Sequence, residues 1–220
     1  METVLHAGDS AEYMPDSGVS AQNLRTAMGT FLTGVTIVTV RGANAEPYGL
    51  TVSSFDSVSL DPPLILWSLD NRHEKAQLFR EAGGFTVNIM PTGSEALIQK
   101  FALSDTERFD GTDWHWGPSG QPVLNTALTS LECSLWAEYP GGDHAIFVGK
   151  VTAINKRDGQ PAAYFKGQIS EARARLIALC CRCVSGRRGW SRSTHPAAEV
   201  VARAVDGARR HIRARCSLCR

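Results

Sequence analysis

Residues 49–63 read GLTVSSFDSVSLDPP, and their apolar and polar side chains alternate as they do in a β-strand with two different faces. The two alternating sets are Leu50, Val52 and Ser54, and Thr51, Ser53 and Phe55. Asp61-Pro62-Pro63 ends the run, because proline has no N–H group for a strand ladder. The stretch therefore predicts one long strand that stops at residue 61.

Five hydroxyl side chains fall within this one strand: Thr51, Ser53, Ser54, Ser57 and Ser59. Two interpretations are open. The hydroxyls could line a planar, heteroatom-rich ligand and bind its edge, or they could form an ordinary water-facing strand surface.

The flanking sequence predicts further strands over residues 31–40, 64–69, 85–90, 131–139, 145–154 and 162–165. LILWSL (Leu64–Leu69) is continuously apolar, which predicts burial on both faces. Helices are expected over residues 21–28, 74–82 and 95–102, the second capped by Asp70-Asn71 and the third by Ser94. A loop is expected around Trp114 and Trp116. Strands joined mostly by turns, with few helices, predict a small antiparallel barrel.

Composition and charge divide the 220-residue chain into a body and a tail. Residues 1–170 hold 11 Lys+Arg against 19 Asp+Glu, a net −8, whereas residues 171–220 hold 12 Arg against three acids, a net +9. The sum is the overall +1. No apolar run approaches the roughly 20 residues that span a bilayer, and the acidic start does not resemble a secretion signal. We expect a cytoplasmic protein without membrane or nucleic-acid partners.

The body lacks the sequence motifs of self-sufficient catalysis. It contains no GxGxxG after a strand, no GxxxxGK[ST], no GxSxG and no HExxH. Cys133 lies within a regular strand pattern, which favours a small buried hydrophobe, and the body histidines lack metal-ligand spacing. If the protein is an enzyme, a cofactor supplies the reactivity.

A family resemblance covers residues 21–168. The segments TGVTIVTV, YGLTVSSFDSVSLDPPLILWSLDNR, FTVNIM, ERFDG, GDHAIFVGKV and AAYFKG, in this order, resemble the flavin reductase-like domain of two-component monooxygenase systems. The resemblance implies a six-stranded antiparallel split β-barrel of the FMN-binding type, with a few short flanking helices. It also implies a homodimer that binds FAD or FMN at the subunit interface.

The same resemblance implies the site residues. Flavin contacts are expected from Thr33, Gly34, Val35 and Thr36 on one strand, and from Thr51, Val52, Ser53, Ser54 and Ser57 on the next. Asn71, Arg72 and Lys75 stand where the family reaches the flavin phosphate, although His73, Glu74 and Lys75 replace its usual hydroxyls. His144 in the Gly142-Asp143-His144 turn is expected to position nicotinamide.

The implied activity is hydride transfer from NADH or NADPH to FAD or FMN, which supplies reduced flavin by diffusion to a separate monooxygenase acting on aromatic compounds. Two alternatives are a non-catalytic split-barrel flavin-binding protein and an oxidase of the pyridoxamine-phosphate type.

Two terminal segments lie outside the resemblance. Residues 1–20 predict a flexible arm, and residues 169–220 form an Arg/Cys-rich extension. Cys180/Cys183 and Cys216/Cys219 are two CxxC pairs, but 32 residues separate them, so a zinc site is not favoured. A basic amphipathic helix over residues 196–215 and a shifted reading frame near residue 169 are the other interpretations.

Overall fold

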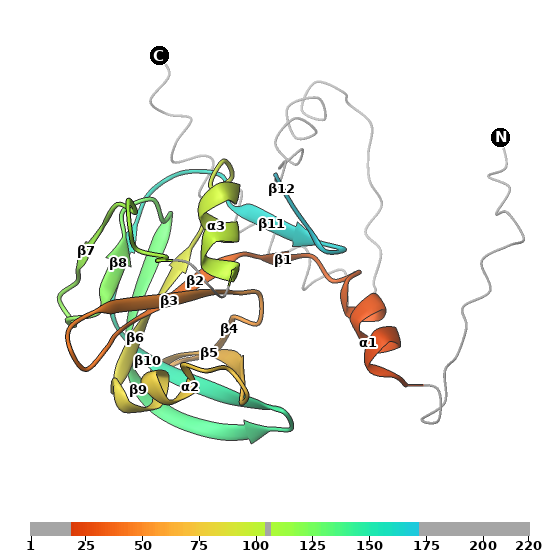
Figure 1. Cartoon of the computed structure of the whole chain (residues 1–220), viewed down its shortest axis with the longest axis horizontal. Helices are drawn as coiled ribbons and strands as arrows, with labels where there is room; N and C mark the ends of the chain where they lie inside the picture. The colour runs from red at the N-terminus through yellow and green to blue at the C-terminus, as the bar shows by residue number, and fades with distance from the viewer. Residues whose placement is uncertain (1–18, 104–106, 172–220) are drawn as a thin grey trace, which may run out of the picture. The chain divides into compact units, whose positions relative to one another are not determined.

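The computed structural model describes residues 19–103 and 107–171 as a mainly β structure with three short helices (Figure 1). The predictions for the arm before residue 19 and for the CxxC pairs and basic helix of the tail lie outside the described residues. Within the described residues, no helix is both long and apolar enough to cross a bilayer.

The main sheet has seven antiparallel strands in the order β3-β2-β6-β9-β10-β5-β4, so the expected count of six is low by one for this sheet. The strands are β2 (Thr36–Arg41), β3 (Pro47–Val52), β4 (Asp56–Leu60), β5 (Pro63–Asp70), β6 (Gly84–Ile89), β9 (Thr129–Gly141) and β10 (His144–Lys156). A second sheet has the order β1-β11-β12 and contains β1 (Thr33–Gly34), β11 (Ala162–Phe165) and β12 (Gln168–Glu171).

The connection between β3 and β4 requires the main sheet to curl. These two strands are its opposite edges, yet only residues 53–55 join them. Six strand spacings would separate the edges of a flat sheet by about 29 Å. Four extended residue steps from Val52 to Asp56 span at most about 14 Å. The sheet therefore closes on itself here without a β3–β4 ladder, which is the geometry of a split barrel.

The same connection corrects the prediction of one strand over residues 50–60. Ser53, Ser54 and Phe55 interrupt it, because the chain passes there from one sheet edge to the other.

A second correction concerns β5. Ile65, Trp67 and Leu69 are buried, but the alternate residues Leu64 and Leu66 are only partly buried. The strand therefore has one core face within this chain rather than two.

The helices confirm two predicted ranges and the N-cap position of Ser94, and they correct the expected cap of α2. α1 (Ala21–Met28) and α3 (Glu95–Ala102) match their predicted bounds, whereas α2 (Ala76–Glu81) is shorter than expected. Asp70 accepts from the backbone N–H of Arg72 in a turn instead of capping α2. Ser94 donates its hydroxyl to Pro91 O rather than accepting from a helix N–H. The expected loop around Trp114 contains a hairpin of β7 (Trp114–Trp116) and β8 (Pro122–Leu124).

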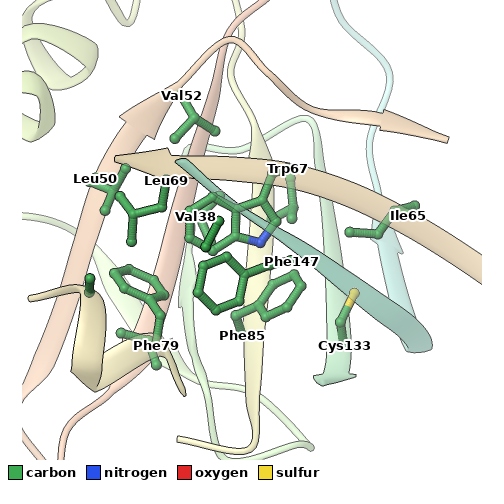
Figure 2. Close-up of a cluster of buried hydrophobic side chains, with 14 residues drawn as sticks. Val38, Leu50, Val52, Ile65, Trp67, Leu69, Phe79, Phe85, Cys133 and Phe147 are labelled. Carbon is green, nitrogen blue, oxygen red and sulfur yellow. The ribbon is translucent and has the colours of Figure 1, made fainter. Parts of the chain in front are cut away.

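The core lies inside the curled sheet and is dominated by aromatic rings (Figure 2). Trp67 stacks on Phe147 with 4.9 Å between ring centroids, and the edges of Phe79 and Phe85 pack against it. Val52, at the end of β3, belongs to the same cluster. The core therefore anchors the strand that leads directly into residues 53–55.

The β11–β12 hairpin extends past the expected domain boundary at residue 168. β12 pairs with β11 from Gln168 to Glu171, and Ile169 packs against the second core cluster, which includes Val35 and Ile37. The barrel domain therefore includes residues up to Glu171.

Candidate functional site

A pocket of about 910 Å³ opens beside the β3–β4 connection. Three segments far apart in the sequence form it: the helix α1 with the residues that follow it, the connection itself, and the turn between β11 and β12. The lining residues include Arg25, Met28, Phe31, Thr33, Ser53, Ser54, Phe55, Asp56, Tyr164 and Lys166. The volume is at the upper end of the range for small-molecule sites.

The connection provides hydrogen-bond donors that the fold does not use. Ser54 Oγ accepts from Ser68 N at 2.9 Å and donates to Ser68 O at 3.2 Å, which fastens the connection to β5. The backbone N–H groups of Ser53, Ser54 and Phe55 donate to no other described residue. A ligand with carbonyl or ring-nitrogen acceptors along one edge fits this row of donors.

Thr33 adds an unsatisfied hydroxyl to the same pocket. Its Oγ1 atom is buried and has no partner among the described residues, an arrangement that costs about 1–3 kcal/mol unless something bonds to it. The neighbouring Gly34 has open space where a Cβ atom would be.

Aromatic and basic side chains complete the pocket, and the sequence did not indicate them. Phe31, Phe55 and Tyr164 provide flat apolar surfaces, and Arg25 and Lys166 provide positive charge. No local pattern could have identified these residues, because the pocket forms only when segments some 110 residues apart come together.

Several predicted contacts have side chains turned away from the pocket. Val35, Thr36 and Val52 are buried in the core. The hydroxyl of Thr36 donates to Val52 O, and that of Thr51 donates to Ile98 O on α3. Packing or an internal hydrogen bond engages the side chain of each of these four residues, so a flavin contact at these positions, which stays a prediction, would use the backbone. Ser57 is exposed but does not line the pocket.

The remaining predicted residues form a second cluster where β5 ends and β10 begins. Arg72 bonds to both carboxylate oxygens of Asp70, at 3.1 and 2.7 Å, and holds the pKa of Asp70 far below its ordinary value. The backbone N–H of Asn71 donates to Asp143 O at 2.9 Å, which links the two ends. His144 Nδ1 lies 2.7 Å from Asp143 Oδ1 and lowers the pKa of that carboxyl group.

This acidic–basic cluster, defined as residues 70–75 with 143–144, is separate from the pocket. Lys75 is exposed, and its backbone N–H donates to Nδ1 of His73. Burial and the charge of Arg108 lower the pKa of His73, so this ring is a neutral acceptor near pH 7.

The sheet register gives the distance between pocket and cluster. Ser54 bonds to Ser68 at one edge of β5. His144, on β10, pairs with Asp70 at the other edge of β5, two residues further along that strand. Strand geometry places the backbones of Ser54 and His144 roughly 12 Å apart. None of the cluster residues lines the pocket.

Cys133 confirms its predicted role as a buried hydrophobe. It is 1% exposed within the core, and burial raises its pKa to about 12, so the thiol is a poor nucleophile. Among the described residues, no three His, Cys, Asp or Glu side chains come together as a possible metal site.

Comparison with known proteins identifies related sequences and folds. The flavin reductase like domain model matches residues 28–173. The NADH FMN reductase SmoA of Agrobacterium fabrum is 38% identical over 150 residues, which are 68% of this chain and 85% of that protein. HsaB, the reductase subunit of a flavin-dependent monooxygenase in Rhodococcus jostii, is 32% identical over 164 residues, covering 74% and 83% of the two chains.

A solved structure has the same fold. The NADH:FAD oxidoreductase of Streptomyces globisporus, in complex with NAD and FAD fragments, is 34% identical with a TM-score of 0.69. The match covers 75% of this chain and 99% of that one.

Proposed function

Because this chain belongs to the flavin reductase-like domain family, we propose that it is an NADH-dependent flavin reductase whose pocket beside residues 53–55 binds FMN or FAD. The relatives named as NADH-dependent FMN and FAD reductases support both the activity and the choice of NADH. The reductase subunits among them support delivery of reduced flavin to a separate monooxygenase.

The observation that carries this proposal is the set of donors in the β3–β4 connection. The isoalloxazine ring of flavin has carbonyl and nitrogen acceptors along one edge and two flat apolar faces. The N–H groups of Ser53, Ser54 and Phe55 match that edge, and Phe31 and Tyr164 offer surfaces for the faces. Thr33 lines the same pocket, and its Oγ1 atom has no partner among the described residues.

Bound flavin supplies the chemistry of the reaction, because it accepts a hydride from the nicotinamide ring of NADH. The protein residues position the two rings and stabilise charge. The unpartnered N–H groups of residues 53–55 are fixed dipoles that stabilise negative charge developing on the ring edge. Phe55, Phe31 and Tyr164 limit the access of water to the reacting faces. A protein nucleophile is not needed.

His144 is proposed to position the nicotinamide. Its Nδ1 atom lies 2.7 Å from Asp143 Oδ1, a contact that orients the ring and leaves Nε2 for the substrate. We predict that His144→Ala raises the KM for NADH about tenfold and changes flavin affinity less than twofold. Steady-state kinetics and flavin titration measure the two effects. An equal loss for both ligands would contradict this role.

The direct test of the function follows NADH absorbance in a mixture of purified protein, NADH and FMN or FAD. We expect NADH to be consumed with either flavin and reduced flavin to accumulate without oxygen. Protein that keeps a flavin bound but consumes no NADH would instead support the non-catalytic flavin-binding alternative. Oxidation of pyridoxamine phosphate would support the other alternative.

A homodimer is also proposed, and exposed apolar side chains on the edge strand β4 and on its neighbour β5 support it. Leu60 is 94% exposed, Val58 is exposed, and Leu64 and Leu66 are only partly covered. Apolar side chains left exposed at the edge of a sheet are typical of a surface that a second copy covers. We predict a dimer by light scattering at micromolar concentration and a shift towards monomer for Leu60→Glu. A wild-type monomer would exclude the dimer.

A further inference from the structure

A half-buried arginine on α2 connects two segments that are far apart in the sequence. Arg80 lies in the last turn of this helix, and its side chain is 30% exposed. Its Nε atom donates to Glu138 Oε1 on β9 at 2.9 Å, and its Nη2 atom donates to Asn71 Oδ1 at 3.2 Å. One guanidinium group therefore joins the β9–β10 hairpin to the turn that follows β5.

The contacts of Arg80 continue to His144. The backbone N–H of Asn71 donates to Asp143 O at 2.9 Å. Asp143 directly precedes His144, and its Oδ1 atom lies 2.7 Å from His144 Nδ1. Arg80 is thus linked to the His144 ring through two residues, each held by a hydrogen bond.

The core fixes both ends of this link. Glu138 pairs with Phe147 across the β9–β10 ladder. Phe79, which precedes Arg80 on α2, is fully buried, and its ring centroid lies 6.5 Å from that of Phe147 (Figure 2). Arg80 therefore extends from a helix that is packed on the core and reaches a strand that is paired with the same core.

The tip of the β9–β10 hairpin has little stiffness of its own. Gly141 pairs with His144, and Gly142 and Asp143 are the two residues between them. Gly142 has a φ of +74°, in the left-handed region that favours glycine. Two consecutive glycines leave a backbone with many accessible conformations. The direction of the tip therefore depends on the bond that Asn71 makes to Asp143.

We propose that Arg80 is a positioning residue for NADH, acting through Asn71 and Asp143 on His144. This inference rests on the proposed function, in which His144 positions the nicotinamide. Arg80 does not line the pocket. A pair as exposed as Arg80 and Glu138 contributes only about 0–1 kcal/mol to stability, so the effect falls on the direction of the His144 ring rather than on folding.

The test measures the KM for NADH in variants of the full chain. Arg80→Met keeps an unbranched apolar side chain and removes the guanidinium group, and Glu138→Ala removes its carboxylate partner. We expect each variant to raise the KM about fivefold and to change kcat less than twofold, because a misplaced ring binds the nicotinamide poorly. Flavin is kept saturating, since residues 71–75 also include predicted flavin contacts.

Two other roles for Arg80 give different results. Arg80→Met and Glu138→Ala change the net charge in opposite directions. If Arg80 only attracted the phosphates of NADH, the KM would rise in Arg80→Met and would not rise in Glu138→Ala, which would overturn the inference. If Arg80 acted only on flavin, flavin affinity would fall while the KM for NADH at saturating flavin stayed constant, which would also overturn it.

Matched variants control for general loosening. Gln77→Met breaks the 2.8 Å bond from Gln77 Nε2 to Glu81 Oε1 on the same helix, outside the link to His144, and should leave the KM within twofold. Glu138→Gln keeps an oxygen acceptor for Arg80 and should retain most of the NADH affinity. All variants should melt within about 4 °C of the unmodified protein. A KM that rises equally in Gln77→Met would overturn the inference.

A double variant tests whether Arg80 acts through His144. His144→Ala alone is predicted to raise the KM about tenfold. Adding Arg80→Met to His144→Ala should leave the KM near that value, because the residue through which Arg80 acts is already gone. A further rise to about fiftyfold would show that Arg80 acts on NADH independently of His144, and the inference would be wrong.

An NMR measurement separates this inference from the proposed function. The ring signal of His144 is assigned by its absence from the spectrum of His144→Ala. Arg80→Met should shift or broaden this signal, and Gln77→Met should not. If the unmodified protein oxidises no NADH, the proposed function fails, and the NMR result still decides whether Arg80 positions His144. If NADH is oxidised but the signal is unchanged in Arg80→Met, the function stands and this inference is wrong.

Discussion

Trp67→Ala is expected to lower the free energy of unfolding by about 3–5 kcal/mol, the largest effect of any single truncation considered. Trp67 is fully buried and contacts three aromatic rings: Phe147 at 4.9 Å, Phe79 at 5.1 Å and Phe85 at 5.6 Å between centroids (Figure 2). Alanine would leave a large cavity between rings that belong to different strands and to α2. Urea denaturation, followed by circular dichroism, measures the loss.

Two further variants control for this result. Trp67→Phe keeps an aromatic ring and removes the indole N–H, which is buried without a partner among the described residues, so its cost should be under half that of alanine. Trp116 is 40% exposed, and Trp116→Ala should cost about 1 kcal/mol or less. A loss below 1 kcal/mol for Trp67→Ala would show that the core repacks around the missing indole.

Ser54→Val is expected to weaken flavin binding by about tenfold to a hundredfold and to reduce kcat/KM by a similar factor. Valine has nearly the same shape but cannot make the two hydrogen bonds to Ser68 that fasten the connection to β5. Loss of these bonds leaves Ser68 N unsatisfied and releases the N–H groups of residues 53–55 from their fixed directions. Flavin titration and NADH kinetics measure the two losses.

Two control variants of the same segment are compared with Ser54→Val. Ser54→Thr retains the hydroxyl and should recover most of the affinity. Ser59→Ala removes a hydroxyl on β4, outside the pocket, and should change flavin affinity less than twofold. If Ser54→Val and Ser59→Ala bind flavin equally well, the connection does not form the flavin site, and the wetted-surface interpretation of the hydroxyls is correct.

The two predictions are linked through Val52. This residue packs in the aromatic core and immediately precedes Ser53 and Ser54. Rigid packing of Val52 holds one end of the connection, and the Ser54–Ser68 bonds hold its middle. A variant that loosens the core at Trp67 should therefore also weaken flavin binding, at temperatures where the protein remains folded.

Local features were predictable where neighbouring residues decide the conformation. Ala21–Met28, Glu95–Ala102 and Ala162–Phe165 have the bounds expected from their patterns, because helix and strand periodicity depends on nearby side chains. Ser94 is the N-cap residue of α3 as predicted, but its side chain does not make the capping hydrogen bond. A serine hydroxyl can serve either a helix N–H or a carbonyl such as Pro91 O, and the tertiary position of that carbonyl decided between them.

The family resemblance predicted flavin contacts at residues 53 and 54, which line the pocket, but it did not predict the directions of the neighbouring side chains. Thr36 and Thr51 carry hydroxyls in the same hydroxyl-rich pattern, but their bonds to Val52 O and Ile98 O keep them inside the structure. An alternating pattern assigns residues to two faces without showing which face a ligand will meet. The face is chosen only when α3 packs over β3.

The amino-acid sequence by itself determined a mainly β chain, its short helices, a hydroxyl-rich segment and family membership, since each of these depends on composition, periodicity or motif order along the chain. Only the tertiary structure decided that the segment breaks at residues 53–55 and that these residues line one pocket with Arg25 and Lys166. The reason is geometric: a three-residue link can join the opposite edges of a seven-stranded sheet only after the whole sheet has curled. The pocket is a product of that closure.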